Sequence, residues 1–169
     1  MTYFKYLFFI VLFFTNLTYS DDNNQLLLIK DKKKIDPFYI TNLKGEDKLI
    51  SGTQSNVIIL NFWATWCAPC IKEIPDLIEL KNRFNDKIDL YFVSVDQNVK
   101  KVVPKFLKKN NFKDLDIVND EKLKISKKFN VKVMPTTIII TKEFHQKYIV
   151  SGYVDWKSDK FLNLINDLL

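Results

Sequence analysis

The chain holds two cysteines, Cys67 and Cys70, which are separated by Ala68 and Pro69. They stand where a continuously apolar run, residues 57–62, gives way to a helical pattern. Two thiols at this spacing can exchange a dithiol for a disulfide with little movement of the backbone. At the start of a helix, free N–H groups and the helix dipole favour a thiolate over a thiol. The pair therefore predicts a redox site.

The position of each thiol predicts its role. Cys67, at the helix start, is expected to have the lower pKa and the greater exposure, and to be the attacking thiol. Cys70, one turn further on, is expected to be more buried and to act as the resolving thiol. A purely stabilising disulfide is disfavoured because so short a loop restricts the unfolded chain little. A zinc site is disfavoured because the two cysteines and the single histidine, His145, supply fewer than four ligands.

Length and composition favour one globular domain that follows an export segment. The chain has 169 residues, of which 47% are hydrophobic and 14% aromatic, enough for a proper core. Residues 1–20 combine a weakly basic start, an apolar run over 6–14 and small residues at the positions that a signal peptidase reads, which resembles a secretory signal cleaved after Ser20. The alternative is an uncleaved N-terminal anchor, a membrane tether with an apolar run shorter than the roughly 17–25 residues of a bilayer span. Both readings place the domain outside the cytoplasm, in the periplasm or on the outer face of the membrane.

The formal net charge of +6 does not identify a partner. Lysines occur in scattered runs that alternate with acidic residues, which is typical of a solvated surface. The chain offers no basic helix and no array of stacking aromatics, so nucleic acid is not expected as a partner.

The pattern along the chain predicts an α/β fold. Residues 21–36 are read as a flexible lead-in with one short strand over 26–29, and the domain as 37–169. The expected strands are a hairpin of 38–40 and 48–50, buried runs at 57–63 and 88–95, a short strand at 115–118, and a final pair at 136–141 and 147–150. The expected helices begin at Ala68, near Val99, after Asn119-Asp120 and before the C-terminus.

These elements predict a mixed central sheet with helices on both faces and an N-terminal β-hairpin. A strand, a helix and a second strand in succession imply a right-handed crossover and parallel pairing of the strands at 57–63 and 88–95. The last two strands form an antiparallel hairpin. Pro75 is expected to kink the first helix, and Pro104 to kink the second or mark its first turn. Cys67 then lies at the carboxyl end of a central strand, the usual location of α/β active sites.

The motif around the cysteines is similar to the active-site region of the thioredoxin superfamily. Residues 61–70 (NFWATWCAPC) with 72–75 (KEIP) resemble most closely its exported TlpA/ResA-like branch of thiol–disulfide oxidoreductases. Residues 133–137 (VMPTT) match the second landmark of that family, and the resemblance extends from about Phe38 to the C-terminus. It implies a thioredoxin-like fold in which Pro135 carries a cis peptide bond and lies against the cysteine pair.

Two positions depart from the family pattern. Cytoplasmic thioredoxins carry a buried Asp where this chain has Asn61, so that proton acceptor is missing. The glycine usual in the last hairpin turn is replaced by Phe144-His145.

Glu73, three residues after Cys70, has two readings. The first is an ordinary exposed charge in the early turns of a helix. The resemblance implies the second, in which this glutamate lies near the thiols and moves protons. A partly buried carboxylate with a raised pKa can accept the proton of Cys70 as that thiol becomes a nucleophile.

The resemblance also implies a substrate-binding surface. Pro135 would hold its loop beside the sulfurs and leave the backbone of Met134 free to pair with an extended substrate segment. Trp66 would shield the thiols and offer a flat contact surface. Pro69, between the cysteines, would set their redox balance.

The resemblance implies a protein-disulfide reductase without an organic or metal cofactor. Its electron donor would be an integral-membrane thiol reductase of the DsbD/CcdA type. Its targets would be oxidised proteins such as apocytochrome c or copper-site cysteines, which places it in cytochrome c or oxidase biogenesis. Two alternatives are a disulfide oxidant or isomerase, with a less negative reduction potential, and a Cu(I) carrier using Cys67, Cys70 and Met134.

Overall fold

The computed structural model describes residues 26–51 and 56–169, with side chains from Lys33 onward. The signal or anchor expected over residues 1–20 lies outside this range. Within the described residues, no helix has the length and apolar character needed to cross a bilayer.

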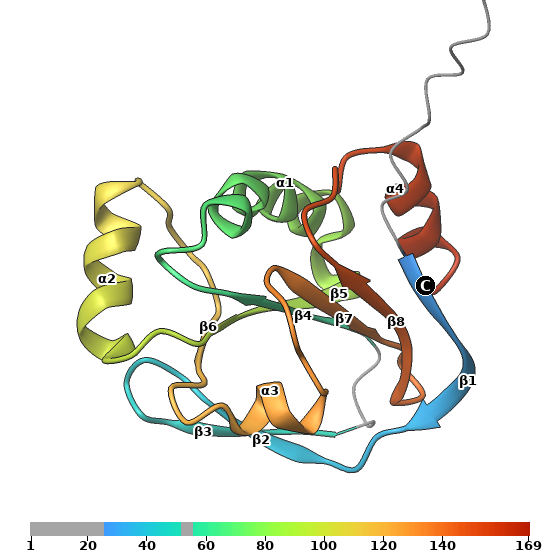
Figure 1. Cartoon of the computed structure of the whole chain (residues 1–169). Helices are drawn as coiled ribbons and strands as arrows, with labels where there is room; N and C mark the ends of the chain where they lie inside the picture. The colour runs from blue at the N-terminus through green and yellow to red at the C-terminus, as the bar shows by residue number, and fades with distance from the viewer. Residues whose placement is uncertain (1–25, 52–55) are drawn as a thin grey trace, which may run out of the picture.

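A six-stranded sheet forms the centre of the molecule (Figure 1). Its strand order is β1-β8-β7-β4-β5-β6. The β4–β5 and β5–β6 pairs are parallel and the other pairs antiparallel, so the predicted mixed sheet is confirmed. The strands are β1 (Leu26–Lys34), β4 (Val57–Trp63), β5 (Ile88–Ser94), β6 (Ile117–Asn119), β7 (Thr136–Ile140) and β8 (His145–Ser151).

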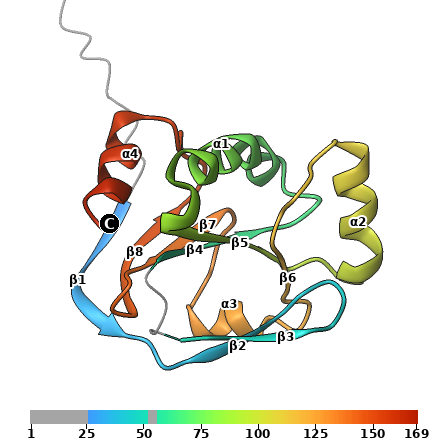
Figure 2. The same cartoon turned by 180° about the vertical axis from the view of Figure 1, so that it is seen from behind.

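Helices cover both faces of this sheet, as predicted. Figures 1 and 2 show α1 and α4 on one face, with α3 and the separate β2–β3 hairpin on the other. The α2 helix packs with α1 and α4 into the same core cluster, which includes Val103 and Ile165. The bounds are α1 (Ala68–Phe84), followed by the 3₁₀ turn η1 (Asn85–Lys87), α2 (Val99–Lys109), α3 (Lys124–Lys128), α4 (Asp159–Asn166), β2 (Phe38–Thr41) and β3 (Asp47–Ile50).

The central strand β4 shows why the apolar runs form the core. All seven of its residues are buried. Because side chains alternate across a sheet, Val57 and Ile59 belong to the cluster beneath α1, whereas Ile58 and Leu60 belong to the cluster beneath α3. A strand covered on both faces needs an unbroken apolar run rather than an alternating one.

Strand β1 is longer than the short strand expected over 26–29. It extends to Lys34 and pairs with β8, with a register shift between Leu28 and Lys33. At its start Leu26 lies opposite Val150. The lead-in therefore contributes an edge strand to the main sheet.

Helix α3 is shorter than expected and begins at Lys124, not directly after Asn119-Asp120. Asp120, one of the two residues expected to precede this helix, nevertheless caps it. Asp120 accepts hydrogen bonds from the backbone N–H groups of Ile125, at 2.9 Å, and Ser126, at 2.8 Å. The carboxylate thus reaches the free donors of the first turn across an intervening turn of chain.

The last hairpin is confirmed, although β8 begins at His145 and not at Lys147. Phe144 occupies the left-handed region with φ of 62°, which ordinarily favours glycine. Its ring is buried and stacks on Phe38 with centroids 6.2 Å apart. The burial of this ring offsets the conformational cost of the turn.

The two prolines predicted to disturb helices both lie inside them. Pro75 lies within α1, and Pro104 lies within α2, five residues after that helix begins at Val99. Pro104 therefore does not mark the first turn.

Candidate active site

Cys67 and Cys70 form a disulfide at the start of α1, with their Cα atoms 5.3 Å apart. Cys67 is the N-cap residue, and its carbonyl accepts a bond of 3.0 Å from the N–H of Ile71. Pro69 lies in the first turn, where a missing N–H leaves no helical bond unmade. The predicted placement of the pair at a helix start, after the carboxyl end of β4, is confirmed.

The two sulfurs differ in access as predicted. Cys67 retains 6% of its surface, whereas Cys70 is fully buried. The preceding Trp66 is 68% exposed, so its ring lies on the surface beside the outer cysteine. Trp63 is fully buried in the core.

Asp96 holds the loop that leads to the cysteines, and sequence reasoning did not identify it. This carboxylate is 2% exposed and accepts bonds from the Thr65 backbone N–H, at 3.0 Å, and the Thr65 hydroxyl, at 2.7 Å. The Ser94 hydroxyl donates to it at 2.9 Å. A usable signal existed: an acidic residue two positions after β5 lies at the same sheet edge as the end of the parallel strand β4.

Pro135 follows a cis peptide bond after Met134. Because Thr136 pairs with Phe62, Pro135 stands level with the carboxyl end of β4, at the sheet edge that carries the cysteines. Its carbonyl accepts a bond of 2.8 Å from the N–H of Gly152. Met134 is half-buried against the core.

Glu73 is fully buried, so the reading as an exposed charge is wrong. It lies three residues after Cys70 and therefore on the same side of α1. Its Oε1 accepts a bond of 2.6 Å from Asn61 Nδ2, and its Oε2 accepts one of 3.3 Å from Trp156 Nε1. Asn61 Nδ2 also donates to Thr137 Oγ1 at 3.0 Å.

Burial changes the acidity of this carboxyl group. Loss of solvation raises the pKa of Glu73 from 4.5 to about 7. Hydrogen bonds from Asn61, Trp156 and the Val154 backbone lower the pKa in part, and the negative charge of Asp76 raises it slightly. A group with this pKa can both accept and release a proton near neutral pH.

Trp156 is the second site residue that sequence reasoning missed. It lies in the connection between β8 and α4 and is fully buried. The signal was a large aromatic residue isolated in a polar segment, between Asp155 and Lys157. Its partner on α1 is 83 positions away in the sequence, so no local pattern connects the two.

His145 begins β8 at the end of the β7–β8 hairpin opposite to Pro135. It therefore lies at the sheet edge away from the cysteines.

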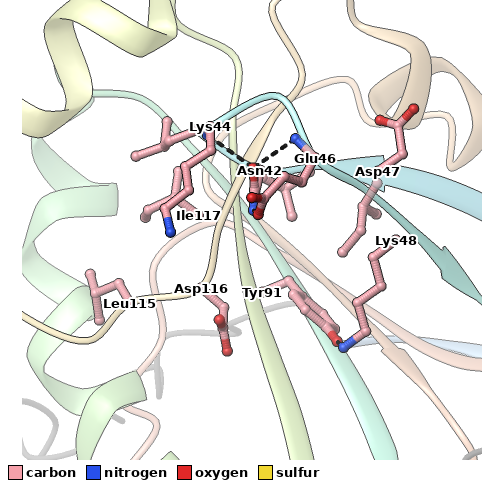
Figure 3. A pocket seen from close by; sticks show the side chains of 12 residues that line it. Asn42, Lys44, Glu46, Asp47, Lys48, Tyr91, Leu115, Asp116 and Ile117 are labelled. Atoms are coloured by element: carbon pink, nitrogen blue, oxygen red, sulfur yellow. Dashed lines mark hydrogen bonds between the residues drawn. The ribbon is translucent and has the colours of Figure 1, made fainter.

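A separate hollow of about 430 Å³ lies between the β2–β3 hairpin and strands β5 and β6 (Figure 3). Lys48 Nζ donates to the Tyr91 hydroxyl at 2.7 Å on its wall. The Asn42 side chain accepts the backbone N–H groups of Lys44 and Glu46. None of the residues predicted for the redox site lines this hollow.

Comparison with known proteins agrees with this geometry. Residues 54–145 match a family model described as thioredoxin-like. The chain is 33% identical over 116 residues to the thiol-disulfide oxidoreductase ResA of Geobacillus kaustophilus, a match that covers 68% of the chain and 66% of that protein. It is 30% identical over 112 residues to ResA of Bacillus cereus, covering 66% of the chain and 64% of that protein. The match thus spans just under two thirds of these relatives' own length.

Two solved structures share the fold. A crystal structure of a putative thiol:disulfide interchange protein DsbE from Chlorobium tepidum has a TM-score of 0.70 and 22% identity, covering 82% of this chain and 97% of that one. StoA from Bacillus subtilis has a TM-score of 0.61 and 28% identity, covering 76% and 96%. With the family match over more than half of its length, the chain belongs to the thioredoxin-like family.

Proposed function

We propose that the protein is an extracytoplasmic thiol–disulfide oxidoreductase that reduces disulfides of other proteins. One observation carries the proposal: a redox-capable cysteine pair lies at the start of α1, and the buried Glu73 lies on the same helix face as the inner cysteine. A disulfide with only a stabilising role has no need of a buried carboxyl group beside it.

The cycle begins with Cys67 as a thiolate. Its sulfur attacks one sulfur of a substrate disulfide, so that a Cys67–substrate bond forms and the substrate bond breaks. The departing substrate sulfur leaves as a thiolate and takes a proton from water. Cys67 is suited to this step because it retains access to solvent and lies at the positive end of the helix dipole.

Cys70 completes the reaction. Its thiol gives up a proton and attacks Cys67 Sγ, which forms the Cys67–Cys70 bond and releases the second substrate thiolate. The substrate gains two electrons and the cysteine pair loses them. Glu73 would accept the Cys70 proton, since its pKa of about 7 leaves much of it ionised at neutral pH and its burial keeps water from competing.

The surface around Cys67 would contact the substrate. Trp66 is exposed beside the outer cysteine, and the Met134–Pro135 segment lies at the same sheet edge. An extended substrate segment could pair with the backbone before the cis proline while its disulfide meets Cys67. Pro69, between the cysteines, would set their redox balance.

The direction of electron flow is proposed from the resemblance to ResA-like proteins. Ala68 and Pro69 between the cysteines carry no charge, and strongly oxidising relatives have a histidine there instead. Because thiols outside the cytoplasm tend to be oxidised, a reductant there needs a continuous electron supply. We propose an integral-membrane thiol reductase of the DsbD/CcdA type as donor, and apocytochrome c or copper-site cysteines as targets.

A trapping experiment tests the assignment of the thiols. Cys70→Ser should leave Cys67 covalently joined to its substrate in cells, and mass spectrometry of the adduct would identify that substrate. Cys67→Ser is the matched control and should trap nothing. If Cys67→Ser traps the substrate and Cys70→Ser does not, the two roles are reversed.

A redox titration tests the direction. Equilibrium of the cysteine pair with glutathione buffers should give a reduction potential near that of thioredoxin, about −270 mV. A value near that of DsbA, about −120 mV, would contradict a reductant and favour the oxidant alternative.

A further inference from the structure

Trp156 contacts the carboxyl group on which the proposed proton transfer depends. We propose that Trp156 is a positioning residue: its indole N–H and the Asn61 amide each hold one carboxyl oxygen of Glu73, so that the orientation of this carboxyl group relative to α1 is fixed. This inference rests on the proposed role of Glu73 as proton acceptor.

The two donors reach different oxygens from different parts of the fold. Asn61, on β4, donates to Oε1 at 2.6 Å, and Trp156, after β8, donates to Oε2 at 3.3 Å. All three side chains are fully buried. A carboxyl group held at both oxygens cannot rotate about its last bond without breaking a hydrogen bond. Its orientation relative to α1 is therefore fixed.

The segment that carries Trp156 is itself attached to the site on both sides. At its start, Gly152 N–H donates to the carbonyl of Pro135 at 2.8 Å. The Lys72 ammonium lies 4.3 Å from the ring centroid of Tyr153. At its end, Lys157 forms a salt bridge of 3.0 Å with Asp76 on α1. The β8–α4 connection thus joins the cis-proline loop to the helix that bears Glu73.

The chemistry of the donors decides which oxygen takes the proton. An indole N–H only donates, so Oε2 must remain an acceptor in both protonation states. A side-chain amide can donate through nitrogen or accept through oxygen. Asn61 Oδ1 is buried and has no hydrogen-bond partner among the described residues. The geometry therefore assigns the proton of neutral Glu73 to Oε1, with the Asn61 amide turned to accept it.

Few charges face this carboxyl group. From α1 it meets Asp76, which pairs with Lys157 of the β8–α4 connection. From β4 and β7 it meets the neutral side chains of Asn61 and Thr137. Burial favours its neutral form, and the hydrogen bonds from Asn61, Trp156 and the Val154 backbone partly oppose that effect.

Indole N–H resonances test this contact directly. The three tryptophans, Trp63, Trp66 and Trp156, give three such signals, which the corresponding Trp→Phe variants assign. In the oxidised protein, where the thiols do not titrate, the Trp156 signal should shift with pH with a midpoint near 7. It should stop shifting in Glu73→Gln. Trp63 is the internal control, since its buried Nε1 has no partner among the described residues.

Kinetics then test the positioning role. Trp156→Phe keeps a buried ring and removes one donor to the ionised carboxylate. The pH midpoint of disulfide reduction should therefore rise by about one pH unit. Trp63→Phe is the matched buried control and should leave the midpoint unchanged.

The outcomes separate this inference from the proposed function. A Trp156 signal that does not titrate, or one that still titrates in Glu73→Gln, overturns the contact. An unchanged midpoint in Trp156→Phe, together with an altered profile in Glu73→Gln, overturns the positioning role and leaves the function of Glu73 intact. An unchanged profile in Glu73→Gln overturns the role of Glu73 and with it this inference.

Discussion

Ionisation of the buried Glu73 should make the folded protein less stable as the pH rises. Its pKa is about 7 in the folded protein against 4.5 for a solvated glutamate. Between these values the folded chain binds a proton that the unfolded chain has released. The stabilisation is fully present below pH 4.5 and is lost as the pH rises through 7.

The size of the effect follows from the interval between the two pKa values. At about 1.4 kcal/mol per pH unit, it corresponds to about 3 kcal/mol of unfolding free energy. That loss is a large part of the free energy of unfolding of a typical domain, which is roughly 5–15 kcal/mol. The glutamine of Glu73→Gln cannot ionise, so this variant should not lose that stability as the pH rises.

The assay is urea unfolding of the oxidised protein from pH 5 to pH 8.5, followed by circular dichroism. The difference between wild type and Glu73→Gln removes the contribution of every other titrating group. Glu79→Gln is the matched control, because Glu79 lies on the same helix and is exposed. Glu73→Gln should gain about 2.5 kcal/mol relative to wild type between the two ends of the pH range, whereas Glu79→Gln should follow wild type.

Glu73→Gln also changes the stability of the protein in a way that does not depend on pH. The new glutamine places an amide nitrogen beside Asn61, whose amide must turn to accept it and then loses its bond to Thr137 Oγ1, and this rearrangement costs stability at every pH. It displaces the Glu73→Gln curve by a constant amount and does not change its slope. Parallel curves for wild type and Glu73→Gln would refute the argument, since they would mean that Glu73 does not titrate in this range.

Substitutions at three further positions test the fold and the site. Asn61→Asp replaces the donor to Glu73 Oε1 by a second carboxyl group, so the midpoint of the stability titration should rise by at least about one pH unit; an unchanged midpoint would contradict the assigned contact. Phe144→Gly relieves a left-handed residue, worth about 1 kcal/mol, but removes a buried ring worth about 3–5 kcal/mol, so urea unfolding should show a net loss of about 2–4 kcal/mol. Asp120→Ala should cost about 2 kcal/mol in the same assay, because it frees buried N–H donors of α3. Asp120→Asn keeps an acceptor and should cost less, and equal stability of Asp120→Ala and wild type would show that the cap contributes nothing.

The elements that position the cysteines could be predicted because their signal is local. An apolar run over β4, followed by a change to helical spacing, already places Cys67 at a strand end and a helix start. The parallel pairing of β4 with β5 follows from the helix between them. Both conclusions need only residues that are close in the sequence.

Strand β1 could be predicted only in part, for a physical reason. Its second half consists of Lys33, Lys34 and their charged neighbours, and lacks the apolar alternation of a strand with a buried face. An edge strand has one hydrogen-bonded neighbour and tolerates such lysines, which also discourage pairing with other chains. From its composition alone, the second half of β1 therefore resembles a flexible segment that precedes the domain.

The sequence around Glu73 contained a sign of its burial, but it did not decide between an exposed charge and a buried proton acceptor. Cys70, Glu73 and Leu77 recur at helical spacing, which places the glutamate within the apolar stripe of α1. Burying a carboxyl group is unfavourable unless donors are provided. Those donors, Asn61 and Trp156, come from distant parts of the chain, so only the folded structure could decide between the readings.

The register of β1 determines where the polypeptide enters the domain. Leu26 lies opposite Val150, near the end of β8 and at the same sheet edge as Pro135 and Cys67. Residues 21–25 span at most about 18 Å when fully extended. If residues 1–20 stay embedded in a bilayer, this short linker keeps the cysteine-bearing edge of the sheet close to the membrane surface. It would then raise the effective concentration of the proposed electron donor in the same membrane. Lengthening this linker with a Gly/Ser insert should then slow re-reduction of the cysteine pair by that donor, while turnover with a soluble dithiol stays unchanged. Equal rates of re-reduction by the donor with the short and the long linker would contradict this effect.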